Sequence, residues 1–392
     1  MTPYATISYF GFLLYPTLPA VALGLVGRLS RWFVLGVTLL MIGLQYGLLL
    51  PGDAAVNVGQ CWQLLAYAAY EGALVKGFSL LRARDRAMPR WAPAVTVTLV
   101  LLPLAAAKLL PALHVSGLVG FLGISYLTFR SLDVIFGIQD RLIKQIRLRD
   151  FWLFLLFFPT IASGPVDRYR RFMKDWEQKR SRAEYLQDLD AAVHRIFRGL
   201  LYKFIIAYYI ETYWLSAAGA THTALGGISY MYAYSFYLFF DFAGYSCFAV
   251  GVSYLFGVRT PENFDNPFLA QNIRDFWNRW HISLSWWFRD HVYMRFVMWA
   301  TKRKLLANKY AISYLGFILS MGLMGIWHGL QWHYILYGLY HAALIIGFDY
   351  LSRWNKRHKR WGEGPVWRWA GVFITFQVVC FGLLLFSGRL FQ

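Results

Sequence analysis

Apolar stretches of nearly the length of a membrane span recur along the whole chain. A helix needs roughly 20 predominantly apolar residues to cross the hydrocarbon core of a bilayer. Ten stretches approach this length, at residues 5–26, 33–50, 61–81, 91–110, 118–137, 196–215, 228–256, 312–327, 332–348 and 367–386. The pattern predicts an all-α, multi-spanning membrane protein with about ten transmembrane helices.

Two further segments are apolar but do not fit a simple span. Residues 151–163, with the sequence FWLFLLFFPTIAS, are too few to cross a bilayer, and they lie between two basic loops. We therefore expect a re-entrant or buried half-helix there, ending at the SGP sequence that follows. In residues 273–293, a helical period of 100° per residue separates a polar stripe from an apolar face. The stripe consists of Arg274, Asn278, His281, Ser285 and Arg289.

This second segment is predicted to be one amphipathic helix. Such a helix lies at the membrane interface or tilts into the protein, where its polar stripe would line a central cavity. On the pattern alone, a surface helix with a solvated His281 is the simpler interpretation, because amphipathicity carries no information about catalysis.

The composition excludes an ordinary soluble domain. Hydrophobic residues make up 58% of the 392 and charged residues 15%, against roughly 45–50% and about 25% in soluble domains. We see no internal repeat, and the longest polar stretch, residues 167–190, is too short and too charged to build a core of its own. We expect residues 1–392 to form a single integral membrane domain.

Lys and Arg gather in alternate loops. The basic loops are 28–31, 82–90, 141–149, 168–182, 302–304 and 353–360. Because positive residues favour the cytoplasmic side, both termini are predicted to be extracellular. The net charge of +19 would then be concentrated on the cytoplasmic face of the protein. This face would attract anionic lipid or an acidic cytoplasmic partner. Nucleic acid is not an expected partner, since the basic residues flank spans and no nucleic-acid-binding module is visible.

Ionisable side chains also occur inside the expected spans. Glu71 with Lys76, Arg130 with Asp133, and Asp241 are interpreted first as buried pairs that fix helix packing. A titratable group at membrane depth persists mainly where it faces a bundle interior or a water-filled cavity.

His328, in the sequence WHG at the end of a span, is as good a candidate for a functional group as for a packing histidine. No zinc-protease, nucleophile-elbow, phosphate-loop or dinucleotide motif accompanies it. The sequence therefore gives no support to a metal-dependent or nucleotide-dependent mechanism.

Four motifs follow one another in a specific order. They are GISYLTFRSLDVI from Gly123, FFPTIASGPVDRYRRF from Phe157, a long segment from FDFAGYS at Phe240 to RDHVY, and MGIWHGLQWHYILYGLYHA from Met324. In this order the chain resembles the membrane-bound O-acyltransferase family over nearly its whole length. Its compact length and the YMRFVMWATKRKL sequence after Val292 favour the branch that transfers D-alanine to teichoic acids. Ala243 and His291 depart from the family pattern.

The resemblance implies a specific reaction. D-alanine would arrive as a thioester on the phosphopantetheine arm of a small acidic D-alanyl carrier protein in the cytoplasm. It would end as an ester on teichoic or lipoteichoic acid, with a membrane-anchored, DltD-like transfer protein as a further partner. The expected location is a bacterial plasma membrane. No permanently bound cofactor and no metal are expected, because the acyl group arrives activated.

The resemblance also implies the site. His328 matches the catalytic histidine of the family, and His281 matches the second histidine of the pair. A neutral imidazole can deprotonate an attacking hydroxyl and then protonate the departing thiolate, and we assign this role to His328. His281 would orient the acyl donor or stabilise the oxyanion. The residues expected to line the cavity around them are Asp241, Asn278, Ser285 and Arg289.

A docking surface for the carrier is predicted directly after the amphipathic segment. Its candidate residues are Phe296, Val297, Met298, Lys302 and Arg303. The cations would attract an acidic carrier over about a Debye length, and the apolar side chains would hold it. The alternative is a helix that anchors in the lipid interface.

Three alternatives to the D-alanyltransferase remain at this point. An O-acetyltransferase of the alginate or polysaccharide type would use another acyl donor. A transporter would also explain about ten spans and buried charges, but no inverted repeat is visible. A non-catalytic scaffold would not need His328.

Overall fold

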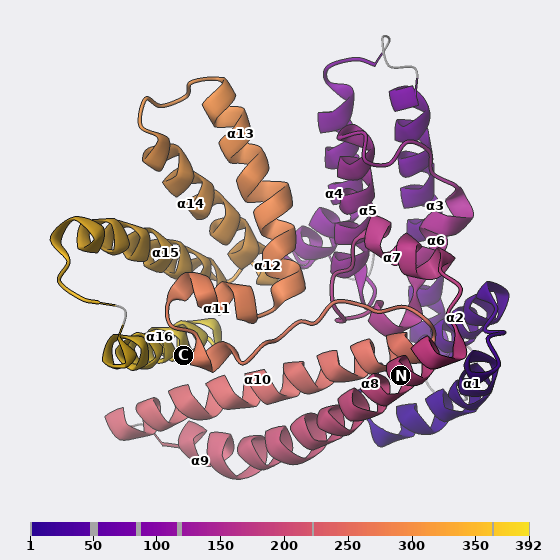
Figure 1. The fold of residues 1–392 in the computed structure, drawn as a ribbon, viewed down its shortest axis with the longest axis horizontal. Helices are drawn as coiled ribbons and strands as arrows, with labels where there is room; N and C mark the ends of the chain where they lie inside the picture. The colour runs from indigo at the N-terminus through magenta and orange to yellow at the C-terminus, as the bar shows by residue number, and fades with distance from the viewer. Residues whose placement is uncertain are drawn as a thin grey trace. The chain divides into compact units, whose positions relative to one another are not determined.

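The structure, a computed structural model, describes residues 2–47, 54–83, 88–115, 120–221, 223–362 and 364–391, without the side chains of 54–58. The ends of two predicted spans, at residues 48–50 and 118–119, lie outside the described residues. Within the described residues the chain is helical, and the only β-bridge joins Phe264 to Trp280. The all-α prediction is confirmed (Figure 1).

The chain forms two compact units. Unit 1 comprises Met1–Gly199 and Tyr245–Pro261, and unit 2 comprises Leu200–Gly244 and Glu262–Gln392. The helix α10, Ala224–Leu255, begins in unit 2 and ends in unit 1.

Unit 1 is built on long apolar helices. Its helices are α1 (Ile7–Leu25), α2 (Arg31–Gln45), α3 (Ala54–Ala83), α4 (Ala92–Ala112), α5 (Ile124–Gln139), α6 (Leu148–Leu156), α7 (Tyr169–Glu177) and α8 (Arg182–Leu200). α3, α4 and α5 pack against one another, and α6 packs on α3 and α5. α1 and α4 each contain two prolines, which are tolerated in spanning helices because neighbouring groups satisfy the freed backbone.

Unit 2 carries both candidate histidines. It contains the π-helical segments η3 (Leu201–Ala207) and η4 (Ile210–Leu215), α9 (Ser216–Gly219), the 3₁₀ turn η5 (Pro267–Leu269), α11 (Ile273–Arg279), α12 (Ile282–Phe288), the π-helical η6 (Arg289–Tyr293), α13 (Met294–Lys302), α14 (Lys309–His328), α15 (Trp332–His358) and α16 (Pro365–Phe386). The helices α14 and α15 lie very close together. A Cβ on Gly325 would stand 2.4 Å from the carbonyl oxygen of Tyr334, and a Cβ on Gly338 would stand 2.3 Å from the carbonyl oxygen of Met321. Only glycine permits this approach.

Seven of the ten predicted spans have a helix that is long and apolar enough to cross a membrane. These are Ile7–Leu25, Gly59–Ala83, Ala92–Ala112, Ala224–Leu255, Lys309–His328, Trp332–His358 and Pro365–Phe386. α2 has 15 residues and α5 has 16, so both are shorter than a simple span. The predicted span 196–215 consists of the end of α8 followed by η3 and η4.

The short apolar segment 151–163 contains a short buried helix, but this helix does not extend to the SGP sequence as predicted. α6 ends at Leu156, and a 3₁₀ turn, η2 (Phe158–Thr160), follows. The guanidinium of Arg130 donates to the carbonyls of Phe154 and Leu155 at 2.9 Å each and to that of Thr160 at 2.8 Å. It therefore satisfies carbonyls that the interrupted helix leaves without partners. Re-entry into a membrane stays a prediction.

The charge pairs at these positions differ from the predicted ones. Asp241, for which the sequence predicts no specific partner, pairs with Lys203. The pairing of Arg130 with Asp133 is wrong, because Asp133 pairs with Arg168 at 2.8 Å and Arg130 bonds backbone carbonyls instead. The pairing of Glu71 with Lys76 is wrong. The Lys76 ammonium donates to the Ile146 carbonyl at 3.4 Å, and the buried Glu71 carboxylate has no hydrogen-bond partner among the described residues.

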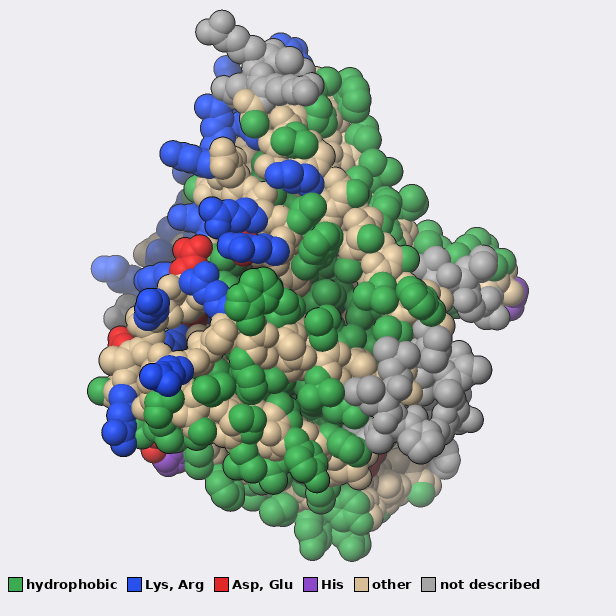
Figure 2. Space-filling view, turned by 90° about the vertical axis from the view of Figure 1, so that its right-hand side faces the viewer, with side chains coloured by type: hydrophobic (Ala, Val, Ile, Leu, Met, Phe, Trp, Pro, Cys, Tyr) green, Lys and Arg blue, Asp and Glu red, His purple; other side chains and the backbone are tan. Residues whose placement is uncertain are grey.

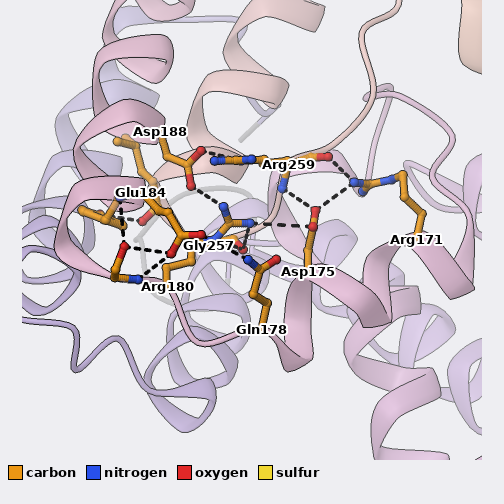
Figure 3. A network of polar contacts seen from close by, with 11 residues as sticks. Arg171, Asp175, Gln178, Arg180, Glu184, Asp188, Gly257 and Arg259 are labelled. Atoms are coloured by element: carbon orange, nitrogen blue, oxygen red, sulfur yellow. Dashed lines mark hydrogen bonds and ion pairs between the residues drawn. The ribbon is translucent and has the colours of Figure 1, made fainter.

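The polar connector 167–190 is held by ion pairs in unit 1 (Figure 3). Asp188 accepts from Arg180 and from Arg259, the latter at 2.6 Å. Asp175 accepts from Arg171 and from the backbone N–H of Arg259, both at 2.9 Å. This network ties the chain after α10 to α7 and α8 without a hydrophobic core of its own.

Candidate active site

His281 lies at a break between two short helices. α11 ends at Arg279, Trp280 is extended, and α12 begins at Ile282. The prediction of one continuous helix over 273–293 is therefore wrong. His281 has φ 44° and ψ 50° in the left-handed region, which is uncommon for a residue other than glycine and recurs at functional sites.

Asn263 holds this unusual backbone. Its side-chain oxygen accepts from the Ser283 hydroxyl at 2.6 Å and from the Ser283 N–H at 3.3 Å. The backbone carbonyl oxygen of Asn263 accepts from the backbone N–H of Ile282 at 2.9 Å. These bonds fix the start of α12 and the orientation of the Asn263 amide, because a backbone N–H can only donate.

The same oxygen determines the tautomer of His281. The Nδ1 atom lies 3.2 Å from Oδ1 of Asn263. Because that oxygen can only accept, Nδ1 carries the proton, and the neutral ring presents an unprotonated Nε2. The ring is 4% exposed and packs edge-on against Phe242, with centroids 4.8 Å apart.

Burial keeps His281 neutral. Burial, and to a lesser extent a like charge on His328, together lower the pKa of His281 to about 3. Both histidines belong to unit 2, and a charge on His328 opposes protonation of His281.

His328 is the last residue of α14. Its half-buried ring lies 4.5 Å from that of Trp327 and 4.9 Å from that of Phe386, centroid to centroid. Tyr334 and Tyr337 of α15 are also neighbours, each at 6.2 Å. The imidazole thus stands at a helix end within an aromatic wall, where a base can be shielded from bulk water.

Of the residues expected to line a cavity, the three from the predicted stripe lie on three successive helical segments, Asn278 on α11, Ser285 on α12 and Arg289 on η6. Asn278 and Arg289 are exposed, and Arg289 pairs with Asp290 at 2.8 Å. Ser285 donates to the Trp280 carbonyl at 3.0 Å and so stabilises the break beside His281. Asp241 lies next to Phe242, the ring neighbour of His281, and its carboxylate pairs with Lys203.

Two further polar groups, Asn263 and His341, lie in unit 2 near the candidate histidines. Asn263 lies in the loop before α11, where no periodicity reveals a role. His341 is fully buried, with ring centroids 4.6 Å from Tyr337 and 5.1 Å from Trp277. Neither of its ring nitrogens has a hydrogen-bond partner among the described residues. From its position beside a span, the sequence predicts His341 to be a hydrogen-bonded packing histidine. The structure confirms the packing position but shows no hydrogen bond among the described residues.

The predicted docking residues lie on and just after α13. Met298 is 56% exposed, and Lys302 and Arg303 are exposed. Phe296 and Val297 are half-buried. Val297 faces α14, since a Cβ on Gly316 would lie 3.1 Å from its side chain.

The sequence profile of the membrane-bound O-acyltransferase family matches residues 137–387. The chain is 44% identical to the teichoic acid D-alanyltransferase of Bacillus subtilis (strain 168), over 100% of this chain and 99% of that protein. It is 39% identical to the protein of the same name from Lacticaseibacillus rhamnosus, over 100% and 98%. The probable alginate O-acetylase AlgI of Azotobacter vinelandii is 34% identical over 57% of this chain and 43% of its own.

Proposed function

Because the chain belongs to the membrane-bound O-acyltransferase family, we propose that it transfers D-alanine to teichoic acid. The observation that carries this proposal is the similarity to teichoic acid D-alanyltransferases from end to end. Similarity to the alginate O-acetylases is confined to part of the chain.

The proposed acyl donor is a D-alanyl thioester on the phosphopantetheine arm of an acidic carrier protein. The net charge of +19 supports a negatively charged partner. The exposed Met298 between half-buried apolar residues and the cations Lys302 and Arg303 supports α13 as the docking surface. The thioester is a substrate in this scheme.

The proposed base is the imidazole of His328. It takes the proton of the attacking hydroxyl while the hydroxyl oxygen forms a bond to the thioester carbonyl carbon. The tetrahedral intermediate then expels the pantetheine thiolate, which takes the proton from the imidazolium. The ester and the free thiol leave, and His328 returns to its neutral state.

The proposed role of His281 is to orient the acyl donor. Its Nε2 offers a lone pair because Nδ1–H is bonded to Asn263. A lone pair can accept an N–H of the donor, from a pantetheine amide or from the D-alanyl ammonium. Oxyanion stabilisation would need a proton on Nε2, which burial disfavours.

The proposed setting is the plasma membrane of a bacterium, with both termini outside. The carrier would then approach from the cytoplasm and teichoic acid from outside, so acyl transfer would also move D-alanine across the membrane. A membrane-anchored, DltD-like partner would assist on the outer side.

Reconstituted protein with radiolabelled D-alanyl carrier tests the proposal. We expect label transfer from the D-alanyl carrier and none from acetyl-CoA. His328→Ala should lower the rate by about 10²–10⁴ and keep the elution profile of the folded protein. The control is His194→Ala, whose side chain is exposed in unit 1. Near wild-type transfer by a folded His328→Ala variant would contradict the proposed role of His328. A preference of the wild-type protein for acetyl-CoA would contradict the proposed acyl donor.

A further inference from the structure

Unit 1 contains an apolar groove that the proposed function does not use. It has a volume of about 500 Å³ and lies between α2, α3 and α6. Its walls include Leu35, Leu39, Leu65, Ala69, Leu153 and Leu156. The wall is well defined, because the indole N–H of Trp152 donates to the Ala68 carbonyl at 3.0 Å.

Cations stand on the rim of the groove. Arg31 is the first residue of α2, and Arg149 is the second residue of α6. Two helix N-termini thus contribute to one groove, and such termini favour negative charge. Arg149 is paired with Asp150 at 3.2 Å, so the two arginines carry one positive charge more than the acid beside them.

A second hollow extends this basic region. It measures about 390 Å³ and shares Arg31 with the groove. Arg28, Lys179 and Arg180 also line it, together with the acids Asp175 and Glu177, so cations outnumber acids on its wall. On the side of unit 1 that Figure 2 shows, Lys and Arg side chains gather along one margin of a broad hydrophobic surface. Apolar volume and positive charge therefore lie next to each other.

We propose that this groove binds an anionic phospholipid. One acyl chain lies between the leucines of α2, α3 and α6, and the phosphate lies at Arg31 and Arg149. Arginine offers paired N–H donors to phosphate oxygens. Basic pockets between membrane helices are a common way to hold anionic headgroups.

Charge and shape together select this occupant. A soluble phosphate would use the arginines but leave the apolar walls unoccupied. An apolar transmembrane segment would fill the walls but not use Arg31. The three tryptophans of the groove, Trp32, Trp152 and Trp176, suit the membrane interface, where amphipathic rings gather.

Native mass spectrometry of the whole delipidated protein in detergent tests the proposal. The probes are dioleoylphosphatidylglycerol, dioleoylphosphatidylcholine and inorganic phosphate. We expect the anionic lipid to bind more tightly than the zwitterionic lipid and inorganic phosphate not to bind measurably. Arg31→Ala should weaken binding of the anionic lipid by about fivefold, which is the effect expected from losing one cation near a headgroup. The matched control is the exposed Arg90→Ala.

A second variant tests the acyl-chain site. Ala69 is exposed and lines the groove, so Ala69→Trp should fill the groove and remove one bound lipid of either kind. Ala66→Trp, on the same helix but off the groove, should change nothing. Equal binding of both lipids, with no effect of Arg31→Ala or Ala69→Trp, would overturn the proposal. A second result would also overturn it. If the folded Ala69→Trp variant bound lipid as the wild type does but no longer retained a membrane partner protein, the groove would be a contact surface for that protein.

Discussion

Nδ1 of His281 lies 3.2 Å from Oδ1 of Asn263, and this pair leaves Nε2 as the unprotonated, hydrogen-bond-accepting nitrogen of the buried ring. The amide cannot be turned around without placing its NH₂ against the Ser283 N–H, which is also a donor. The tautomer of His281 therefore depends on a residue 18 positions away in the chain. Asn263 is therefore a positioning residue that acts through His281.

Changing Asn263 should move the pH dependence of the reaction. An aspartate accepts the same hydrogen bonds, but its charge stabilises the imidazolium and so raises the pKa of His281 from the low value that burial gives it. In Asn263→Asp, Nε2 should then become protonated as the pH falls from about 8 to 6, and kcat/KM should fall there more steeply than in the wild type. The measurement is the pH profile of D-alanyl transfer.

Asn263→Ala separates positioning from charge. It leaves a buried N–H of His281 without its acceptor, which we expect to lower kcat about 10- to 100-fold without shifting the profile. The control is Asn278→Ala, an exposed amide on α11. Identical profiles for the Asn263→Asp variant and the wild type would contradict the assignment of the tautomer.

The long spans were predictable because a bilayer selects for length and apolar composition. The break at His281 was not, because a helical period records spacing alone. The left-handed backbone there is held by Asn263 and Ser283, and contacts between loop and helix leave no periodic trace. The wrong prediction of a Glu71–Lys76 pair has a simpler cause. Glu71 and Lys76 are five residues apart, which places them on different faces of one helix.

Replacing Arg130 should destabilise unit 1. Its guanidinium bonds three carbonyls and the Thr160 hydroxyl around the break after α6, and it is buried. Lysine keeps the charge but has no planar fork of donors. We expect Arg130→Lys to lower stability by ~3 kcal/mol, the scale for disrupting a buried charged network, measured as a lower thermal aggregation temperature in detergent. The control Arg90→Lys, at an exposed position, should leave the thermal aggregation temperature unchanged.

Carrier affinity should depend on the exposed side of α13. Met298→Asp places a charge in the predicted apolar contact and should weaken binding by ~2 kcal/mol. Lys302→Glu should mainly slow association and reduce its dependence on salt. Val297→Asp is a poorer test because Val297 packs toward Gly316. The measurement is binding of the loaded carrier in detergent, with Lys356→Glu as a control on another exposed helix end. Unchanged affinity and rates in Met298→Asp and Lys302→Glu would leave α13 as a lipid anchor.

Thiol labelling in whole cells tests the orientation. The background variant replaces Cys61, Cys247 and Cys380 with serine. Ala220→Cys lies at an exposed position in a loop region without Lys or Arg, whereas Lys356→Cys lies at an exposed position in the basic segment 353–360. Since basic loops stay in the cytoplasm, an impermeant maleimide should label the first in intact cells and the second only after permeabilisation.

The outcome also bears on the acyl donor. Labelling of Lys356→Cys alone in intact cells would place the basic loops outside, together with the cations that follow α13. A cytoplasmic carrier could not then reach its proposed docking surface, so this result would contradict both the orientation and the route of D-alanine across the membrane.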